Sequence, residues 1–193
     1  MWAIISNNCW GAGLYQELDI KYNTPTVGLW FQADDYISLL QNFRSTISKP
    51  LQFIENSRFG TKTHPVGLLG ENIEVQFLHY SSQEEATRKW TSRTARLPVN
   101  DDDLYIKICD RDGLEQRHLD AFARLSFKHK VGFFKRGRFN ILDYPWAVEV
   151  DSACPTVDDG VALWHQIRRE GLFDASSWVT SQRSTESSEA PQC

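Results

Sequence analysis

The chain has 193 residues, of which 41% are hydrophobic and 24% are charged, and its formal net charge at pH 7 is −4. This length is typical of one domain, the apolar share is that of a soluble globular protein, and the acidic balance argues against a general nucleic-acid-binding protein. No apolar run approaches the ~18 residues of a membrane span, and no cation precedes Lys21 to open a signal sequence. We therefore expect a cytoplasmic protein without a membrane span.

Short apolar runs alternate along the chain with segments of helical periodicity. In the first half, the pattern predicts a strand over 1–6, a loop over 7–13, an extended segment over 26–31, a helix from 36 that ends before 50, and strands over 51–54 and 73–77. In the second half it predicts helices over 82–96, 113–125 and 156–170 and strands over 104–109, 131–134 and 147–150. Ser82 with Glu85 forms a capping-box pattern, and Gly171 stands at an expected C-cap.

This alternation favours an α/β fold, because parallel strands need crossover helices between them. We expect a single three-layer domain over 1–175 with a mostly parallel sheet flanked by helices, and a disordered polar tail over 176–193. In such folds, ligands bind beyond the carboxyl ends of the strands. The segments expected there are Asn7-Asn8-Cys9, His79-Tyr80 and Asp110-Arg111-Asp112.

Cys9 is the first candidate for chemistry, because it lies between a strand and an expected helix start. A helix N-terminus lowers the pKa of a thiol, and its N–H groups, with the amides of Asn7 and Asn8, are suited to an oxyanion. A neutral His79 imidazole would deprotonate the thiol, and Asp110 would orient the ring. The alternative interpretation is structural: Cys9 packs as a small hydrophobe, and Asp110 caps a turn.

The cysteine spacing also limits the redox and metal chemistry that we expect of this chain. Cys9, Cys109, Cys154 and Cys193 are far apart in sequence, without the Cys-x-x-Cys spacing of zinc or redox sites. In a chain of this size without a secretion signal we expect reduced thiols, so a functional cysteine would act alone.

Asp110-Arg111-Asp112 offers a second chemistry, since it has the Asp-x-Asp form with which sugar-nucleotide transferases hold a divalent metal on a diphosphate. Two such tripeptides occur in the chain, so composition alone also accounts for the pattern. Gly11-Ala12-Gly13 lacks the third glycine of a dinucleotide fingerprint, because Gln16 stands there.

The helix expected over 82–96 carries a stripe of Lys89, Arg93 and Arg96. Such a stripe suits a phosphate-bearing cofactor or donor. The pairs Glu84 with Arg88 and Glu85 with Lys89 are equally typical of a solvated helix face, and we favour that interpretation.

The opening segment Ile4-Ile5-Ser6-Asn7-Asn8-Cys9-Trp10-Gly11, together with 22–29 and 77–80, resembles a bacterial family of unknown function associated with exopolysaccharide biosynthesis. Later residues of this chain that match the family pattern are Glu85, Trp90, Arg93, Arg96, Lys107 and 110–113. The resemblance covers residues 2–150 and departs at Gly11-Ala12, where the family has two glycines. Asn8-Cys9-Trp10 is also similar to the first-strand Asn-Cys motif of capsule-polysaccharide acetyltransferases, whose cysteine is proposed to act with a histidine.

These resemblances imply a transferase of exopolysaccharide or capsule biosynthesis that moves an acyl group, with acyl-CoA as the donor, to a saccharide hydroxyl, without a tightly bound metal. The expected catalytic residues are Cys9, His79 and Asp110. The expected substrate-binding residues are Asn7, Asn8, Trp10, Gly11, Tyr80, Arg93, Lys107 and Asp112. Two alternatives stay open: a metal-dependent glycosyltransferase that uses a nucleotide sugar with Asp110 and Asp112, and a saccharide-binding protein without catalysis.

Overall fold

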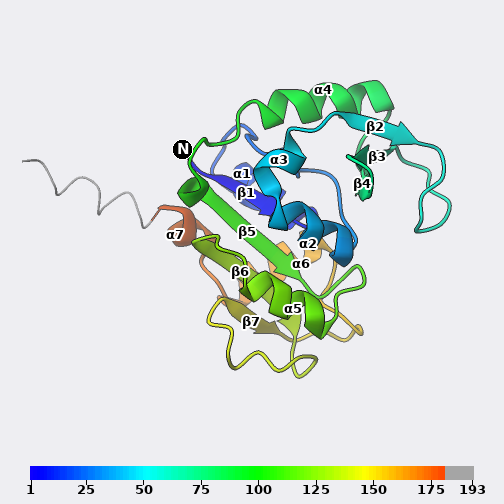
Figure 1. Cartoon of the computed structure of the whole chain (residues 1–193). Coiled ribbons are helices and arrows are strands. Elements are labelled where there is room, and N and C mark those ends of the chain that lie inside the picture. The colour runs from blue at the N-terminus through cyan, green and yellow to red at the C-terminus, as the bar shows by residue number, and fades with distance from the viewer. Residues whose placement is uncertain (181–193) are drawn as a thin grey trace, which may run out of the picture.

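The computed structural model describes residues 1–180, which contain two β-sheets. The larger sheet has four parallel strands, in the spatial order β1 (Ala3–Ser6), β5 (Leu104–Cys109), β6 (His129–Lys135) and β7 (Ala147–Val150) (Figure 1). The smaller sheet is antiparallel, in the order β2 (Leu51–Ile54), β3 (Val66–Leu69) and β4 (Ile73–Gln76). The predicted parallel sheet is confirmed, and the small antiparallel sheet is an addition to it.

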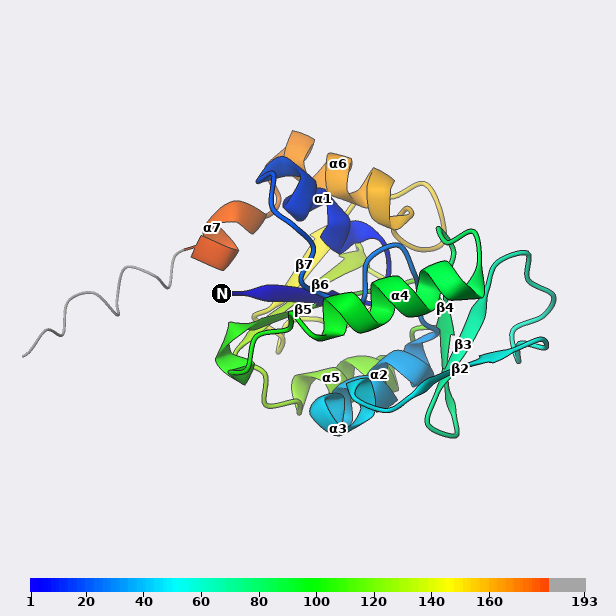
Figure 2. The same cartoon turned by 90° about the horizontal axis from the view of Figure 1, so that it is seen from above.

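Helices cover both faces of the larger sheet, as Figure 2 shows. On one face lie α1 (Trp10–Glu17) and α6 (Gly160–Glu170), and on the other lie α2 (Ala33–Gln41), α3 (Phe43–Ile47) and α5 (Gln116–Ala123). The chain returns from the smaller sheet through α4 (Gln83–Thr94) and a 3-10 turn (Asp101–Asp103), and α7 (Ala175–Thr180) follows α6. The α/β class with flanking helices is therefore confirmed. Among residues 1–180, no helix is both long and apolar enough to cross a membrane.

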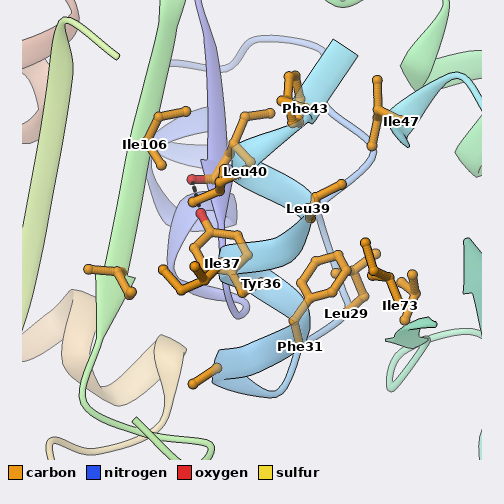
Figure 3. Close-up of a cluster of buried hydrophobic side chains, with 14 of the residues drawn as sticks. Leu29, Phe31, Tyr36, Ile37, Leu39, Leu40, Phe43, Ile47, Ile73 and Ile106 are labelled. Carbon is orange, nitrogen blue, oxygen red and sulfur yellow. Dashed lines mark hydrogen bonds between the residues drawn. The ribbon is translucent and has the colours of Figure 1, made fainter. Parts of the chain in front are cut away.

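Successive residues of the parallel strands serve opposite cores, because strand side chains alternate between the two faces. Ile5 and Ile106 belong to the core beneath α2 and α5, whereas Ile4 and Tyr105 belong to the core beneath α1 and α6. Figure 3 shows the first of these cores. There the Tyr36 hydroxyl of α2 donates to the backbone carbonyls of Ile5 and Lys107, both at 2.9 Å, and so ties α2 to two neighbouring strands.

The predicted helix ends are confirmed where a side chain or a glycine decides them. The Ser82 hydroxyl accepts from the Glu85 backbone N–H at 3.2 Å, and the Glu85 carboxylate reaches back one residue further, to Ser81. Gly171 has φ of 64° at the end of α6, a left-handed conformation that glycine adopts without strain. Asp159, at the start of α6, accepts from two backbone N–H groups of its first turn.

Several predicted boundaries were wrong. Residues 26–31 form no strand and contribute only the isolated bridge of Trp30 with Gln76. The loop expected over 7–13 contains the first residues of α1, because its glycines serve close packing instead of breaking the helix: a Cβ on Gly13 would lie 2.5 Å from the Trp164 ring. The tail expected from 176 begins inside α7, and the rest of it lies outside the described residues.

Candidate functional site

The carboxyl ends of β1 and β5 are neighbours, since these strands pair in parallel register from Ala3 with Leu104 to Ser6 with Lys107. Asn7, Asn8 and Cys9 leave β1 at this edge, and residues 110–112 leave β5 beside them. The N-terminus of α6 also lies here, because a Cβ on Gly160 would stand 2.5 Å from the Trp10 backbone nitrogen. Segments from the beginning, middle and end of the chain therefore meet at the edge where α/β folds bind ligands.

Two cavities adjoin at this edge, and Cys9 and His79 line both of them. The first cavity has a volume of about 640 Å³, and its wall combines the aromatic residues Trp10, Tyr22 and Trp164 with small apolar residues and with Glu17 and Arg168 at one side. The second has about 600 Å³ and is more polar; its other lining residues include Asn8, Trp30, Arg111, Asp112, Asp159 and Gly160. Cys9 and His79 therefore line the same two cavities, and their action as a catalytic pair stays a prediction.

Cys9 occupies the N-cap position of α1 and is partly buried, with its Sγ 3.9 Å from the Leu29 carbonyl oxygen. Burial raises the pKa of the Cys9 thiol; the nearby Lys107 ammonium opposes this shift, and Asp159 and Asp112 add to it. The predicted fall in this pKa at a helix N-terminus was wrong, because loss of solvent outweighs the local positive charge. Cys9 therefore rests as a thiol and needs a base to react.

His79 reaches the site from the smaller sheet, just beyond β4. Its backbone N–H donates to the Gly28 carbonyl at 3.1 Å, which holds it against the same segment that contacts Cys9 through Leu29. The imidazole is exposed and lies in the walls of both cavities. This position suits a group that takes a proton from Cys9 or from a bound hydroxyl.

Asp110 does not orient His79, and this predicted role was wrong. Its carboxylate is fully buried and accepts from the backbone N–H groups of Lys135 and Val157 at 2.9 and 2.8 Å, with Arg138 3.3 Å away. Three partners therefore use this carboxylate to join the ends of β5 and β6 to the loop before α6. Because the side chain turns inward, it has no place in either cavity.

Of the two aspartates, Asp112 has more of the features that are typical of a functional residue. It has φ of 58°, a left-handed conformation that is unusual for a residue with a Cβ. Burial raises its pKa to about 6, against the influence of Arg111 and Lys107. Backbone strain and a perturbed carboxyl in a cavity wall are both typical of functional positions.

The two aspartates do not converge as a metal pair, because Asp110 is committed inside the protein and Asp112 faces the second cavity. Within residues 1–180, no group of three or more His, Cys, Asp or Glu side chains is arranged to hold a metal ion. The Asp-x-Asp interpretation therefore has no geometric support from Asp110.

Beneath Cys9 lies a buried polar cluster that Asn7, Asn8, Lys107 and Cys109 form, and Asn8 also reaches the wall of the second cavity. The Lys107 ammonium is fully buried and donates to the side-chain oxygens of Asn7 and Asn8 at 3.2 and 2.9 Å. The two amide nitrogens donate to the Sγ of Cys109 at 3.5 and 3.2 Å. Burial lowers the pKa of Lys107. The amide oxygens of Asn7 and Asn8 face Lys107, and each NH2 uses one of its two N–H donors on Cys109, so these side chains brace the cluster. Their oxyanion role stays a prediction.

The remaining predicted substrate residues mainly build the scaffold. Trp10 is buried between Phe133 and Trp164, with ring centroids 5.2 Å away in each case. Gly11 is buried, and a Cβ there would lie 3.1 Å from Ile4. Tyr80 and Arg93 brace the segment after α1: the Tyr80 hydroxyl donates to the Val27 carbonyl at 2.5 Å, and Arg93 donates to that hydroxyl at 2.6 Å.

Sequence reasoning missed Cys109, Trp164 and Asp159. Cys109 was noted only as a cysteine without a partner, and its role depends on the amides of Asn7 and Asn8. Trp164 and Asp159 lie on or just before α6, whose N-terminus meets α1 only in the folded chain. Cys9, Cys109 and Cys154 are free thiols, and Cys193 lies outside the described residues.

Comparison with known proteins places this site in a family. Residues 1–144 match a family model described as a domain of unknown function, DUF1919. The chain belongs to the DUF1919 family. A Haemophilus influenzae protein described as uncharacterized is 38% identical to this DUF1919 member over 130 residues, which cover 67% of this chain and 60% of that relative. The predicted membership of a family of unknown function is confirmed, and the association with exopolysaccharide stays a prediction.

The matched DUF1919 region contains Cys9, His79 and Asp112, and it ends before α6. The walls that Asp159, Trp164 and Arg168 contribute to the cavities therefore lie outside the matched residues. The candidate reactive groups belong to the shared part of the family fold, whereas part of the cavity lining comes from the segment beyond it.

Proposed function

We propose that this protein is a transferase that moves an acyl group from a thioester donor to a saccharide hydroxyl in exopolysaccharide or capsule biosynthesis. The single observation that carries the proposal is that Cys9 and His79 line the wall shared by two adjoining cavities. Transfer between two bound molecules needs such a wall, because the nucleophile must reach the donor from one side and the acceptor from the other.

The chemistry of the two walls suggests which substrate each cavity takes. The first cavity, with the Tyr22 and Trp164 rings and the apolar side chains of Val27 and Val161, suits the acyl group and the apolar arm of a thioester. The second combines the Trp30 ring with the polar side chains of Asp112 and Arg111, and an aromatic face with polar neighbours is suited to a saccharide. We therefore assign the donor to the first cavity and the acceptor to the second.

The reaction runs in two steps. In the first, the Cys9 Sγ attacks the acyl carbonyl of the donor, His79 accepts the thiol proton, and the donor thiolate leaves and takes that proton from His79. In the second, a saccharide hydroxyl attacks the acyl-cysteine, His79 accepts the hydroxyl proton, and the Cys9 thiolate leaves and is protonated again. Because burial raises the pKa of Cys9, the histidine is required in the first step as well as the second.

Asp112 is the carboxyl group best placed to assist the acceptor. Its pKa of about 6 leaves it partly protonated near neutral pH, so it is able to accept or donate a hydrogen bond to a saccharide hydroxyl. The N-terminus of α1 begins directly after Cys9, and its dipole favours negative charge that develops beside the thiol. In this proposal Asp112 takes over from Asp110, and the α1 dipole acts beside the oxyanion role first given to Asn8.

The test is acylation of the intact protein. We expect incubation with acetyl-CoA to add one acetyl group to Cys9, detected by intact-mass and peptide mass spectrometry, and a capsule saccharide to remove it. Cys9→Ala should lower saccharide acylation on the order of 10³-fold or more. Cys154→Ala is the matched control, because Cys154 is exposed and outside both cavities, and it should leave the rate unchanged.

Other outcomes would assign a different function. Acylation of saccharide by Cys9→Ala at the unaltered rate would remove the cysteine mechanism. Loss of saccharide transfer from a nucleotide sugar on chelation, or in Asp112→Asn, with a mild effect of Cys9→Ala, would favour metal-dependent glycosyl transfer. Saccharide binding without any turnover would favour a binding protein.

A further inference from the structure

A third cavity lies between α4 and the segment that follows α1, and it is strongly basic. Its volume is about 250 Å³, and five of its lining side chains are cationic. This basic pocket is defined by Lys21, Arg88, Lys89, Arg93 and Arg96, with Tyr22 between them. Such a concentration of positive charge is unexpected in a chain whose net charge is −4.

Most of this positive charge has no carboxylate partner within residues 1–180. Lys89 pairs with Glu85 at 2.6 Å, whereas in the described part of the chain Glu84 interacts with Ser82 and forms no ion pair with Arg88. Lys21 and Arg88 are exposed, and neither forms an ion pair in the described part of the chain. Like charges that converge without a counter-charge repel one another, so the pocket favours an anion that neutralises them.

Arg93 and Arg96 are held in place by neutral acceptors, which leaves their charge uncompensated. Arg93 donates to the Tyr80 hydroxyl and to the Val27 carbonyl at 3.1 Å, and its guanidinium lies 5.1 Å from the centre of the Tyr22 ring. Arg96 donates to the Tyr22 carbonyl through two nitrogens, at 3.1 and 2.7 Å. Two fixed guanidinium groups form a rigid site, and such groups match the geometry of phosphate oxygens.

Stabilisation of the α4 dipole explains only part of this arrangement. Cations in the last turns of a helix interact favourably with its C-terminus, which accounts for basic residues on α4. Lys21 is outside α4 and still joins the pocket, and Arg96 lies beyond the end of the helix and binds the segment after α1. The convergence of two chain segments on one cavity needs a further reason.

The position of Tyr22 connects this pocket with the candidate reaction site. Tyr22 lines both the basic pocket and the first cavity, whose wall also contains Cys9. We propose that the basic pocket binds the phosphate or diphosphate group of an extended donor, which passes Tyr22 and places its reactive end at Cys9. The identity of that reactive end as an acyl thioester rests on the function proposed above, whereas phosphate binding by the pocket does not.

The experiment compares two double variants that remove the same charge. Lys21→Gln with Arg88→Gln removes two exposed cations from the pocket, and Lys49→Gln with Arg124→Gln removes two exposed cations elsewhere. Binding of inorganic pyrophosphate and of coenzyme A is measured by isothermal titration calorimetry. We expect both ligands to bind the pocket variant at least about tenfold more weakly than the unaltered protein, and the control variant to match the unaltered protein.

Pantetheine supplies the ligand control, because it carries the thiol arm of coenzyme A without its phosphates. It should bind the unaltered protein and the pocket variant equally. Equal affinity of pyrophosphate for the two double variants, or no saturable binding to the unaltered protein, would overturn the proposal. Displacement of pyrophosphate by a sugar nucleotide but not by coenzyme A would show that the phosphate belongs to a different substrate, and would overturn the assignment to the thioester donor.

Failure of this proposal is distinguishable from failure of the proposed function. If acetyl-pantetheine acylates Cys9 but the pocket variant binds pyrophosphate normally, the acyl-transfer function is supported and the phosphate site is rejected. If pyrophosphate binding depends on Lys21 and Arg88 but no thioester acylates Cys9, the phosphate site is supported and the acyl-transfer function is rejected.

Discussion

The thiol of Cys9 is subject to two opposing influences. Burial raises its pKa, and the Lys107 ammonium, which lies in the polar cluster beneath it, works against that rise. The net effect is upward, so at neutral pH the thiolate fraction of Cys9 is smaller than that of an ordinary cysteine. The protein therefore differs from enzymes that store a ready thiolate and depends on a neighbouring base.

We expect Cys9 to react more slowly with iodoacetamide than Cys154 at neutral pH, since the thiolate is the reactive form and Cys154 is exposed. The rates are measured by peptide mass spectrometry in a Cys193→Ser variant. Buried Cys109 serves as an internal control that should stay unlabelled in folded protein. Faster labelling of Cys9 than of Cys154 would show that its pKa is lowered and would contradict the burial argument.

The raised pKa of Asp112 predicts that the protein loses stability as the pH rises through a defined range. Its pKa rises from 3.8 to about 6 in the folded chain, so the stability that the protonated form contributes is fully present below pH 3.8 and is lost as the pH rises through about 6. Asparagine cannot ionise and tolerates the left-handed backbone that Asp112 adopts. Asp112→Asn should therefore become more stable relative to the unaltered protein as the pH rises through this window.

The size of the Asp112 effect is bounded by the pKa shift, at most about 3 kcal/mol, and partial exposure of the side chain reduces it. Chemical denaturation at about pH 4 and about pH 8, on either side of the window, measures the difference. Exposed Asp143 provides the control substitution, Asp143→Asn, for which no comparable trend is expected. An Asp112→Asn effect that is the same at both pH values would contradict the raised pKa.

At the scale of elements, the smaller sheet is attached to α2 through one arginine. Arg58 donates to both carboxylate oxygens of Asp35 on α2, at 2.8 and 3.0 Å, and to Glu74 on β4 at 3.0 Å. Both carboxylates are buried, whereas Arg58 is half exposed. Burial raises the pKa of Asp35; at Glu74 burial acts in the same direction, but hydrogen bonds from Ser57 and Arg58 outweigh it and hold that pKa below its usual value.

Arg58→Met should therefore cost about 2 kcal/mol or more, because it leaves two buried carboxylates without a cation. Arg44→Met is the matched control, since Arg44 pairs with an exposed aspartate, Asp101, at 2.6 Å and should cost below about 1 kcal/mol. Urea denaturation of both variants gives the comparison. A similar small loss for the two arginines would show that the buried carboxylates are protonated or hydrated instead.

Sequence patterns predicted the elements best where local signals and burial agree. The strand over 104–109, which is buried throughout, has the predicted bounds, and Ser82 caps α4 as expected. β3 was missed because its apolar run is short and contains Gly67. The strand needs a glycine there, because a Cβ at this position would lie 2.5 Å from the Leu51 side chain across the hairpin. A run bounded by Pro65 and Gly70 was the available signal.

The sequence predicted the location of the candidate site better than the roles of the residues in it. Residues beyond strand ends were expected to converge, and Cys9, His79 and Asp112 do so. The direction of each side chain was not available from the sequence, and it decides that Asp110 turns inward to Lys135 and Val157 while Asp112 faces a cavity. Hydrogen bonds between residues about a hundred positions apart, such as Lys107 with Asn8, also depend on the fold.

At the scale of the whole molecule, the candidate site joins residues from the two sheets, and these sheets differ in how well they are buried. Cys9 follows β1 of the larger sheet, in which β5 is buried throughout and pairs with a strand on each side. His79 follows β4 of the smaller sheet, whose edge strand β2 is only half buried. The strand before the nucleophile therefore pairs directly with the most buried strand of the larger sheet, whereas the strand before its base belongs to a sheet with a half-exposed edge.

Native-state hydrogen exchange should reveal this difference. We expect the slowest amides at Ile106 and Ile108 in β5, with an opening free energy close to that of global unfolding, because their loss requires disruption of both neighbouring strands and both cores. Amides of β2 and β3 should open with a free energy at least about 2 kcal/mol lower. Equal protection of the two sheets would mean that they unfold as one unit, and local opening of the smaller sheet would then be excluded as a way to move His79 relative to Cys9.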